Sequence, residues 1–417
     1  MATSVKTARA PRAPLSGSHK KMLVALSCAV GLRMLGLFLV LPVFTLYGLE
    51  FTRSRLLVGV AFGCYGIAVA FTAVPMGRLS DHIGRRKVLL LGMAIFGLGS
   101  VLCALPPWFP PSTRIGILVA GRFVQGLGTI TAAAFAAVAD QIPEERRSTA
   151  MAILGIPVGI AFAVGVIGGP IIAAAFRAQS LFWLTAVFAM ITLVLLGRHL
   201  HDAPPRQQEV ARIRDVLRNR RLLALDAGGF LMNTFMTAFW FYLPLILTQQ
   251  HHLRLSRFYI VLLPMLLISG LTMFGFSRSA DRGLGPHFAA LAFLIMAASG
   301  VLLFRPETIG LNPAHLAAVI VPGALFFVGF TGLEPILPSL VSKYAHESAY
   351  GTALGSFQTL QYLGSFTGGA LAGALSGLSR AAPMSFMTLI GFIGLGVMLL
   401  SRAQVKEPSS AISANEN

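Results

Sequence analysis

Four ionisable side chains lie inside long apolar stretches of the sequence: Arg33, Arg122, Asp226 and Glu334. A charge in such surroundings is costly, so these residues usually pair with one another or face a water-filled cavity. Because desolvation disfavours the charged form of a carboxylate, Asp226 and Glu334 can each alternate between neutral and charged forms. The chemistry that these residue types indicate is therefore proton binding and release, with arginines as counter-ions.

Three of these residues also have a purely structural interpretation. Asp226 can cap the N-terminus of its helix, Arg122 can pin a helix through backbone carbonyls, and Glu334 can serve packing alone. The three cysteines, Cys28, Cys64 and Cys103, show no metal spacing. The sequence also contains neither a phosphate-binding glycine loop nor a nucleophile triad. We therefore expect no enzyme activity, no cofactor and no use of ATP.

The composition requires a solvent other than water. Hydrophobic residues make up 55% of the 417 residues and charged residues only 12%, against roughly 25% charged in soluble proteins. The mean hydropathy is +0.76. A net charge of +18 would suggest nucleic acid on a soluble chain. Here the basic residues lie in short loops between apolar runs, so we expect membrane lipid and no nucleic acid as the partner.

The apolar runs are long enough to cross a bilayer, which takes about 20 residues. Backbone polar groups in lipid must be paired internally, so each run is predicted to be a helix. The expected fold is an all-α integral membrane protein with about twelve transmembrane helices, at residues 22–48, 56–78, 87–106, 114–139, 149–176, 180–198, 222–248, 256–278, 287–304, 314–340, 350–375 and 381–401.

The loops predict the orientation and the organisation of the chain. Lys and Arg favour one side by about three to one, which indicates that both termini are cytoplasmic. The longest polar stretch between helices contains Pro204-Pro205, and its segment Arg206–Arg221 is predicted to form a basic helix on the membrane surface. The expected parts are a basic cytoplasmic tail at 1–21 (alternatively a cleaved transit peptide), a six-helix bundle at 22–198, a linker at 199–221, a second bundle at 222–401 and a tail at 402–417.

The loop after the second helix reads Gly77-Arg-Leu-Ser-Asp81-His-Ile-Gly84-Arg85-Arg86-Lys87. Gly77 permits close helix approach and Gly84 permits a tight turn. The loop resembles the signature loop of the major facilitator superfamily, whose fold has two pseudo-symmetric six-helix bundles. The resemblance implies that the loop gates transport, that Asp81 lies at the N-terminus of the eleventh helix near Gly351-Thr352, and that Arg85 pairs with Asp140. The alternative is a positively charged turn that only sets topology. The second-half copy around Asp281 lacks the first glycine.

Two further motifs lie on the fourth and fifth helices. Arg122-Phe-Val-Gln125-Gly126 resembles the superfamily motif associated with proton coupling. The fifth helix resembles the motif of drug/proton antiporters, although Ile171-Ile172 replace its final glycine pair. Its residues are Gly155, Gly159, Gly165, Gly169 and Pro170. The proline bends the helix and the glycines admit a neighbour, so helix packing without a functional role is the alternative.

Three segments narrow the resemblance: Leu32–Val43, Leu333–Lys343 and Gly351–Gly364. Together they resemble the YajR-type bacterial drug/proton antiporters, nearly to residue 400. The resemblance implies a cavity lined by the first, fourth, seventh and tenth helices, which carry the four charges within the apolar stretches. Across such a cavity we expect Arg33 to be the counter-ion of Glu334 in one state.

The function expected from this resemblance is proton-coupled export of a small-molecule substrate, by a monomer in the bacterial inner membrane. The alternatives are a sugar or metabolite carrier of the same fold and a non-transporting membrane receptor or assembly factor.

Overall fold

The computed structural model describes residues 17–142, 144–200, 218–279, 284–346, 349–379 and 381–403. Throughout these ranges the regular structure is helical, without a strand. Three expectations concern residues outside them in whole or in large part: the two terminal tails, the basic surface helix at Arg206–Arg221, and the second-half loop copy around Asp281.

The N-terminal bundle is built from six membrane-crossing segments. Helix α1 (Gly17–Val40) is followed by the short α2 (Phe44–Leu49), α3 (Arg55–Ile83), α4 (Arg85–Ala104) and the 3-10 turn η1 (Pro106–Trp108). The fourth crossing consists of α5 (Pro111–Leu127) and α6 (Thr131–Gln141), and α7 (Glu144–Phe176) and α8 (Gln179–His199) complete the bundle.

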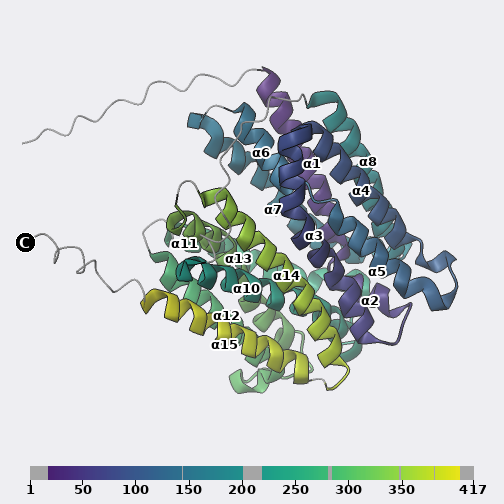
Figure 1. Ribbon diagram of the computed structural model, residues 1–417. Helices are drawn as coiled ribbons and strands as arrows, with labels where there is room; N and C mark the ends of the chain where they lie inside the picture. The colour runs from purple at the N-terminus through teal and green to yellow at the C-terminus, as the bar shows by residue number, and fades with distance from the viewer. Residues whose placement is uncertain are drawn as a thin grey trace, which may run out of the picture.

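The C-terminal bundle repeats this plan. Helix α10 (Arg220–Leu245) runs into the π-helical turn η2 (Ile246–Gln250), and the 3-10 turn η3 (Leu255–Arg257) precedes α11 (Tyr259–Ser279). The remaining elements are α12 (Gly285–Phe304), η5 (Pro306–Ile309), α13 (Ala317–Tyr344), α14 (Tyr350–Ser376) and α15 (Ala381–Ala403). Figure 1 shows the two bundles side by side, with α3 next to α14.

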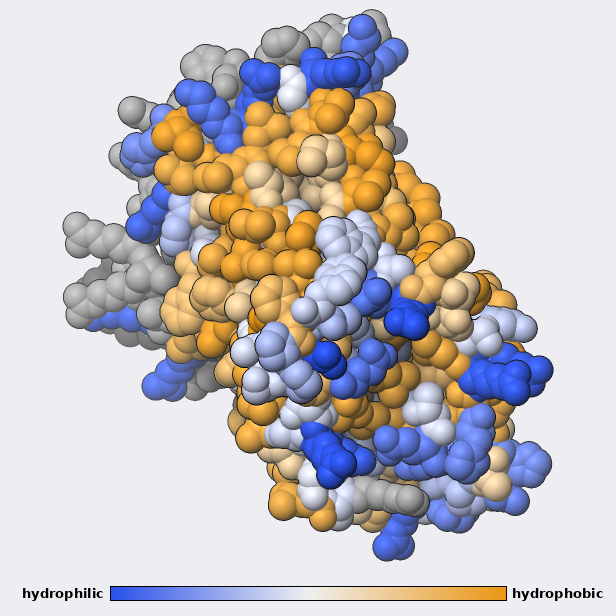
Figure 2. All heavy atoms as spheres, turned by 90° about the vertical axis from the view of Figure 1, so that its right-hand side faces the viewer, coloured by the Kyte–Doolittle hydropathy of each residue, from blue (hydrophilic) through white to orange (hydrophobic). Residues whose placement is uncertain are grey.

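Eleven helical segments among the described residues are long and apolar enough to cross a membrane. Helix α14 is not one of them, yet its 27 residues match the others in length and complete the twelve expected crossings. The sequence of α14 is rich in Gly, Ser, Thr and Gln, and the helix packs between α3 and α10. In Figure 2 a broad apolar band lies between hydrophilic ends, as a bilayer requires.

Two crossings that the sequence predicted as continuous helices are broken. Leu41–Val43 form a turn between α1 and α2, where Pro42 lacks the N–H that a continuous helix needs. Gly128–Ile130 interrupt the fourth crossing. At Gly128 a Cβ would collide with the carbonyl oxygen of Gly92 and the backbone of Phe96 on α4. The break therefore accompanies a backbone contact that only glycine allows.

The two bundles meet along α3 and α14, and the fit changes along this seam. At Gly59 and Gly63 an added Cβ would collide with the α14 backbone at Gly369 and Phe366. Toward the loop the contact loosens, since a Cβ at Gly355 would meet only Val74, at 3.9 Å. We call the tight end of the molecule, at the start of α3, the Arg55 end, and the opposite one, where α3 meets α4, the Asp81 end.

Candidate functional site

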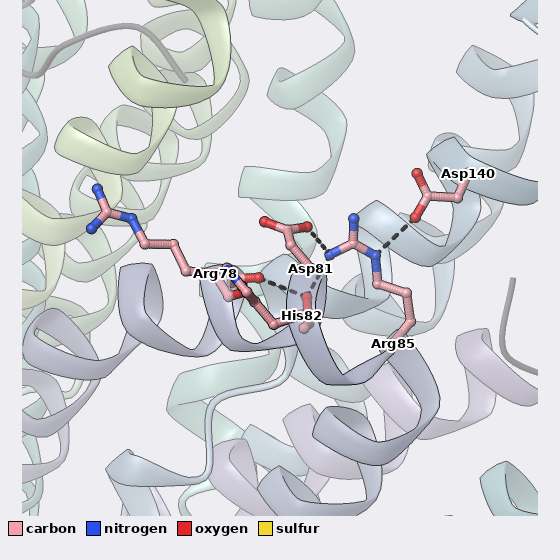
Figure 3. Close-up of polar contacts among 7 residues, drawn as sticks. Arg78, Asp81, His82, Arg85 and Asp140 are labelled. Atoms are coloured by element: carbon pink, nitrogen blue, oxygen red, sulfur yellow. Dashed lines mark hydrogen bonds and ion pairs between the residues drawn. The ribbon is translucent and has the colours of Figure 1, made fainter. Parts of the chain in front are cut away.

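The loop between α3 and α4 holds a compact cluster of charges (Figure 3). Gly84 turns the chain with a φ of 99°, a backbone conformation that side chains with a Cβ rarely adopt, and Arg85 begins α4. The Arg85 guanidinium, whose side chain is only 6% exposed, forms an ion pair with Asp81. Its Nε also donates to Asp140 of α6 at 2.8 Å. The structure thus contains the Arg85–Asp140 contact that the family resemblance implies.

The surrounding contacts anchor this cluster inside the N-terminal bundle. The hydroxyl of Ser80 accepts from Arg85 and donates to the carbonyl of Gly77 at 2.8 Å. Nη2 of Arg86 donates to the carbonyl of Gly197 on α8 at 2.6 Å. Arg78 points away from the cluster in Figure 3. The cluster therefore couples α3, α4, α6 and α8 to one another, while the expected contact of Asp81 with α14 stays a prediction.

The glycines that sequence analysis singled out differ in how closely they are packed. A Cβ at Gly77 would meet only the Cβ of Ala132, at 3.9 Å, so this conformation does not need glycine there. On α7 a Cβ at Gly155 or Gly159 would find open space. In the other half of α7, Gly165 and Gly169 contact the α1 backbone so closely that a Cβ would collide with it.

Pro170 lies inside α7, one residue after this contact. Of these four glycines, only the two in the Arg55 half of α7 lie against the α1 backbone, whereas in the other half Pro157 approaches Gly31 of α1.

Two buried arginines share one aromatic ring. Nη2 of Arg33, on α1, donates to the Tyr65 hydroxyl of α3 at 2.7 Å. The guanidinium carbon of Arg122, on α5, lies 4.9 Å from the centre of the same ring. Nη1 of Arg122 also donates to Oε1 of Gln125 at 2.5 Å, and Gln125 in turn donates to Ser100 of α4 at 2.9 Å. The fold thus brings Arg33, Arg122 and Gln125 together as a buried group, and their expected place in the substrate cavity stays a prediction.

Glu334 lies well inside α13, and part of its surface is nevertheless left uncovered by other residues. It interacts electrostatically with the hydroxyl of Tyr362 on α14, as Arg33 and Tyr65 do from the other bundle. Glu334 therefore faces the space between the bundles rather than lipid. In the part of the chain that the structure describes, Glu334 and Arg33 are not within ion-pair distance in this conformation.

Asp226 has a different environment. It is 3% exposed on α10, and its Oδ2 accepts a hydrogen bond from Ser356 of α14 at 2.7 Å. Its other carboxylate oxygen is buried without a hydrogen-bond partner. The N-cap of α10 is Asn219, whose side chain accepts from two backbone N–H groups. Capping by Asp226, the structural interpretation of this residue, is therefore wrong.

A sequence profile of the Major Facilitator Superfamily matches residues 26–369. The chain belongs to the major facilitator superfamily. The inner membrane transport protein YajR of Escherichia coli (strain K12) is 32% identical over 391 residues, which cover 92% of this chain and 83% of YajR.

Two further comparisons bear on function and on fold. The multidrug resistance protein MdtL of Escherichia fergusonii is 29% identical over 184 residues, or 42% of this chain and 45% of MdtL. A solved bacterial homologue of the human lysosomal transporter Spinster has the same fold, with a TM-score of 0.75 at 12% identity over 94% of this chain and 98% of that one.

Members of this superfamily change conformation as one bundle moves against the other, so contacts between bundles report the state of the molecule. At the Arg55 end, Nη1 of Arg55 donates to the carbonyl of Ser376, the last residue of α14, at 2.6 Å. The negative end of the α14 dipole favours a cation there. Together with the glycine contacts along the seam, this bond closes the Arg55 end of the transporter.

Sequence analysis missed three residues of this arrangement. Tyr65 joins the two buried arginines, Tyr362 faces Glu334, and Arg55 bridges the bundles. Tyr362 lies within the segment Gly351–Gly364 and Arg55 lies in a predicted loop, but neither residue belongs to the part of a motif that indicates a function. A tyrosine in an apolar run is too common to signal a polar role, so only the fold identifies Tyr65.

Proposed function

We propose that this transporter works by alternating access as a proton-coupled exporter of small organic or drug-like compounds. The observation that supports the proposal most is the position of Glu334, deep within α13, with part of its surface uncovered, and beside Tyr362. A carboxylate reached by water between the bundles can exchange a proton with whichever side the cavity faces. A carboxylate with a purely structural role would instead be buried against a permanent partner.

The conformation described here suggests how the exchange proceeds. With the Arg55 end closed, we propose that Glu334 gives up its proton toward the Asp81 end and that substrate enters from the same side. The bundles then rock, substrate leaves at the Arg55 end, and Glu334 takes up a proton there. Arg33 is the natural counter-ion of the charged carboxylate once the bundles come closer. In this scheme Arg122 packs against Tyr65, and Gln125 links Arg122 to Ser100 of α4.

The names of the relatives support the transport direction and the cellular location that we propose. YajR is named as an inner membrane transport protein and MdtL as a multidrug resistance protein. We therefore assign this chain to the bacterial inner membrane, as an exporter with the Asp81 end and both termini in the cytoplasm. The excess of basic residues in the loops of that side supports this orientation.

The test compares gradient-driven transport with counterflow in one proteoliposome preparation. Glu334→Gln mimics the protonated state permanently, so it should abolish accumulation against a gradient under an imposed pH difference and retain substrate counterflow. Glu307→Gln is the matched control, because Glu307 is exposed in η5, outside the membrane spans. If Glu334→Gln still accumulates substrate, Glu334 is not the coupling residue, and Asp226 takes its place as the candidate.

Cysteine labelling tests the orientation separately. In a background without the native cysteines, an impermeant reagent outside the cell should label positions near Arg53, Trp108 and Arg254. It should fail to label positions near Arg85 and Arg212. Labelling of both sets from the same side would contradict the proposed topology.

A further inference from the structure

Two positive charges are buried side by side in the N-terminal bundle. Arg33 is 1% exposed and Arg122 is 7% exposed. They are held against one residue, since Arg33 bonds the hydroxyl of Tyr65 and Arg122 lies over its ring. Phe96 and Phe44 cover the two guanidinium groups from other directions, each with its ring centre 5.1 Å away. The two cations therefore share a small, aromatic and nearly dry compartment.

The protein leaves this charge largely uncompensated. Nε and Nη1 of Arg33 and Nε of Arg122 are buried without a hydrogen-bond partner. Among the residues that the structure describes, neither Arg33 nor Arg122 forms an ion pair, whereas Arg85 pairs with Asp81 and Asp140. A single buried cation without a partner is already unfavourable, and two neighbouring ones also repel each other. A structural role alone does not account for this arrangement, because apolar residues would fill the same space at lower cost.

An anionic ligand would supply both the negative charge and the hydrogen-bond acceptors that the two arginines lack. Guanidinium groups donate several hydrogen bonds in fixed directions and are well suited to carboxylate, sulfonate or phosphate groups. The compartment has one partly exposed side chain, Tyr65, and both Tyr65 and Arg33 interact electrostatically with Tyr362, as Glu334 does. Rotation of the Tyr65 ring would connect the unpaired guanidinium donors with the space that Glu334 faces.

We propose that Arg33 and Arg122 form a binding site for the anionic group of a small aromatic organic acid, which enters past Tyr65 from the space that Glu334 lines. The aromatic part of the ligand lies against Tyr65 and Tyr362, and its anionic group takes the unpaired donors of the two arginines. This inference concerns ligand binding and goes beyond the proposed transport function. Binding of the anion requires neither a gradient nor proton coupling.

Glu334 acts on such a site as a competing negative charge. It faces the same space, and both Glu334 and Arg33 interact electrostatically with Tyr362. Neutralising Glu334 should therefore strengthen anion binding, whereas the loss of either arginine should weaken it. This opposite dependence separates an anion site from a merely apolar pocket.

The experiment uses radiolabelled benzoate and the full chain purified in detergent, with benzylamine as a cationic probe of the same size and benzyl alcohol as a neutral one. Wild-type protein should bind benzoate and discriminate against both other probes. Arg33→Met and Arg122→Met should each weaken benzoate binding at least tenfold, and Arg33→Lys should retain part of it. Glu334→Gln should bind benzoate severalfold more tightly, even if it turns out to have no role in proton coupling.

Thermal unfolding without ligand provides a second measurement that does not depend on the probe. Arg33→Met should raise the melting temperature, because it removes an uncompensated buried charge and keeps the volume. Arg85→Met, the control, should lower it, because Arg85 is paired with Asp81 and Asp140. The proposal is overturned if wild-type protein does not bind benzoate, if benzylamine binds equally well, or if Arg33→Met lowers the melting temperature as Arg85→Met does.

Discussion

The two ends of α3 carry charged residues with opposite structural roles. At the Asp81 end, the ion pairs of Arg85 with Asp81 and Asp140 stay within the N-terminal bundle. At the Arg55 end, Arg55 reaches across to the carbonyl of Ser376 in the other bundle. A contact within one bundle survives when the bundles move as rigid bodies, whereas a contact between bundles has to break.

The difference identifies where the present conformation is stabilised. The contacts that distinguish it from the opposite conformation are the Arg55 bond and the glycine seam at Gly59 and Gly63. The loop that carries the family signature gains its contact between bundles only if Asp81 reaches α14 in the other conformation. Substitutions at the two ends should therefore shift the equilibrium in opposite directions.

The largest effect is expected at the seam. A Cβ at Gly63 would collide with the backbone of α14 at Phe366. Gly63→Ala should therefore disfavour closure of the Arg55 end by about 1–3 kcal/mol, the usual cost of overpacking. Spin-label distances between the bundles at the Arg55 end should lengthen, and the transport rate should fall about tenfold or more.

The matched control makes the same change where space is available. A Cβ at Gly270, in α11, would meet nothing within 4 Å. Gly270→Ala should therefore leave distances and transport near wild-type values. Equal effects of the two substitutions would show that the seam does not set the conformation.

Arg55→Gln should have the next largest effect. It removes a charge-assisted hydrogen bond to the end of α14, which we expect to contribute about 1–2 kcal/mol to the closed Arg55 end. The population open at that end should rise about tenfold in the same spin-label measurement. Arg53→Gln, at an exposed position two residues earlier, should change nothing. A wild-type distance distribution in Arg55→Gln would remove Arg55 from the description of the gate.

Asp81→Asn should act in the opposite direction and less strongly. If Asp81 contacts the N-terminus of α14 when the Asp81 end closes, its loss should favour the present conformation by about 1 kcal/mol. Arg85 keeps Asp140, so the fold of the loop should persist. Distances at the Asp81 end should lengthen on average, whereas His82→Asn, next to Asp81 and exposed, should leave them unchanged. A shift in the same direction as that of Arg55→Gln would contradict the proposed gating role of the loop.

The smallest effect is a pH dependence at the Arg55 end. Burial raises the pKa of the Glu50 carboxyl at the end of α2, and Arg177 opposes this shift. Helix α2 contacts α10 of the other bundle, so we expect opening to hydrate Glu50. A raised pKa means that the closed conformation binds the proton more tightly, so acid should favour closure.

Because Glu50 is partly exposed, this shift should stay below about 1 kcal/mol. The measurement is the change in spin-label distances at the Arg55 end between pH 7 and pH 5. Glu50→Gln should reduce the change, and the exposed Glu307→Gln should not. An equal response in both variants would assign the pH dependence to another group.

The sequence predicted the helices well because lipid permits few alternatives to a helix, so apolar runs translate directly into elements. The Arg85–Asp140 contact also followed from a recognisable motif. The break at Gly128–Ile130 was missed because glycine in a membrane helix indicates close packing and interruption equally. The partners of Arg33 and Arg122 were missed because Tyr65 lies far from both in the sequence.

The polar character of α14 has a consequence for how the chain is made. Helix α14 is less apolar than the other crossings, so its insertion into a bilayer by itself is less favourable. Its small residues lie against α3 and α10, where the carbonyls of Phe230 and Thr234 approach Gly364 and Gly368. Both partner helices are synthesised before α14, so we expect them to be in the membrane already when α14 is inserted. A defect in α3 should therefore impair insertion of α14 as well as transport.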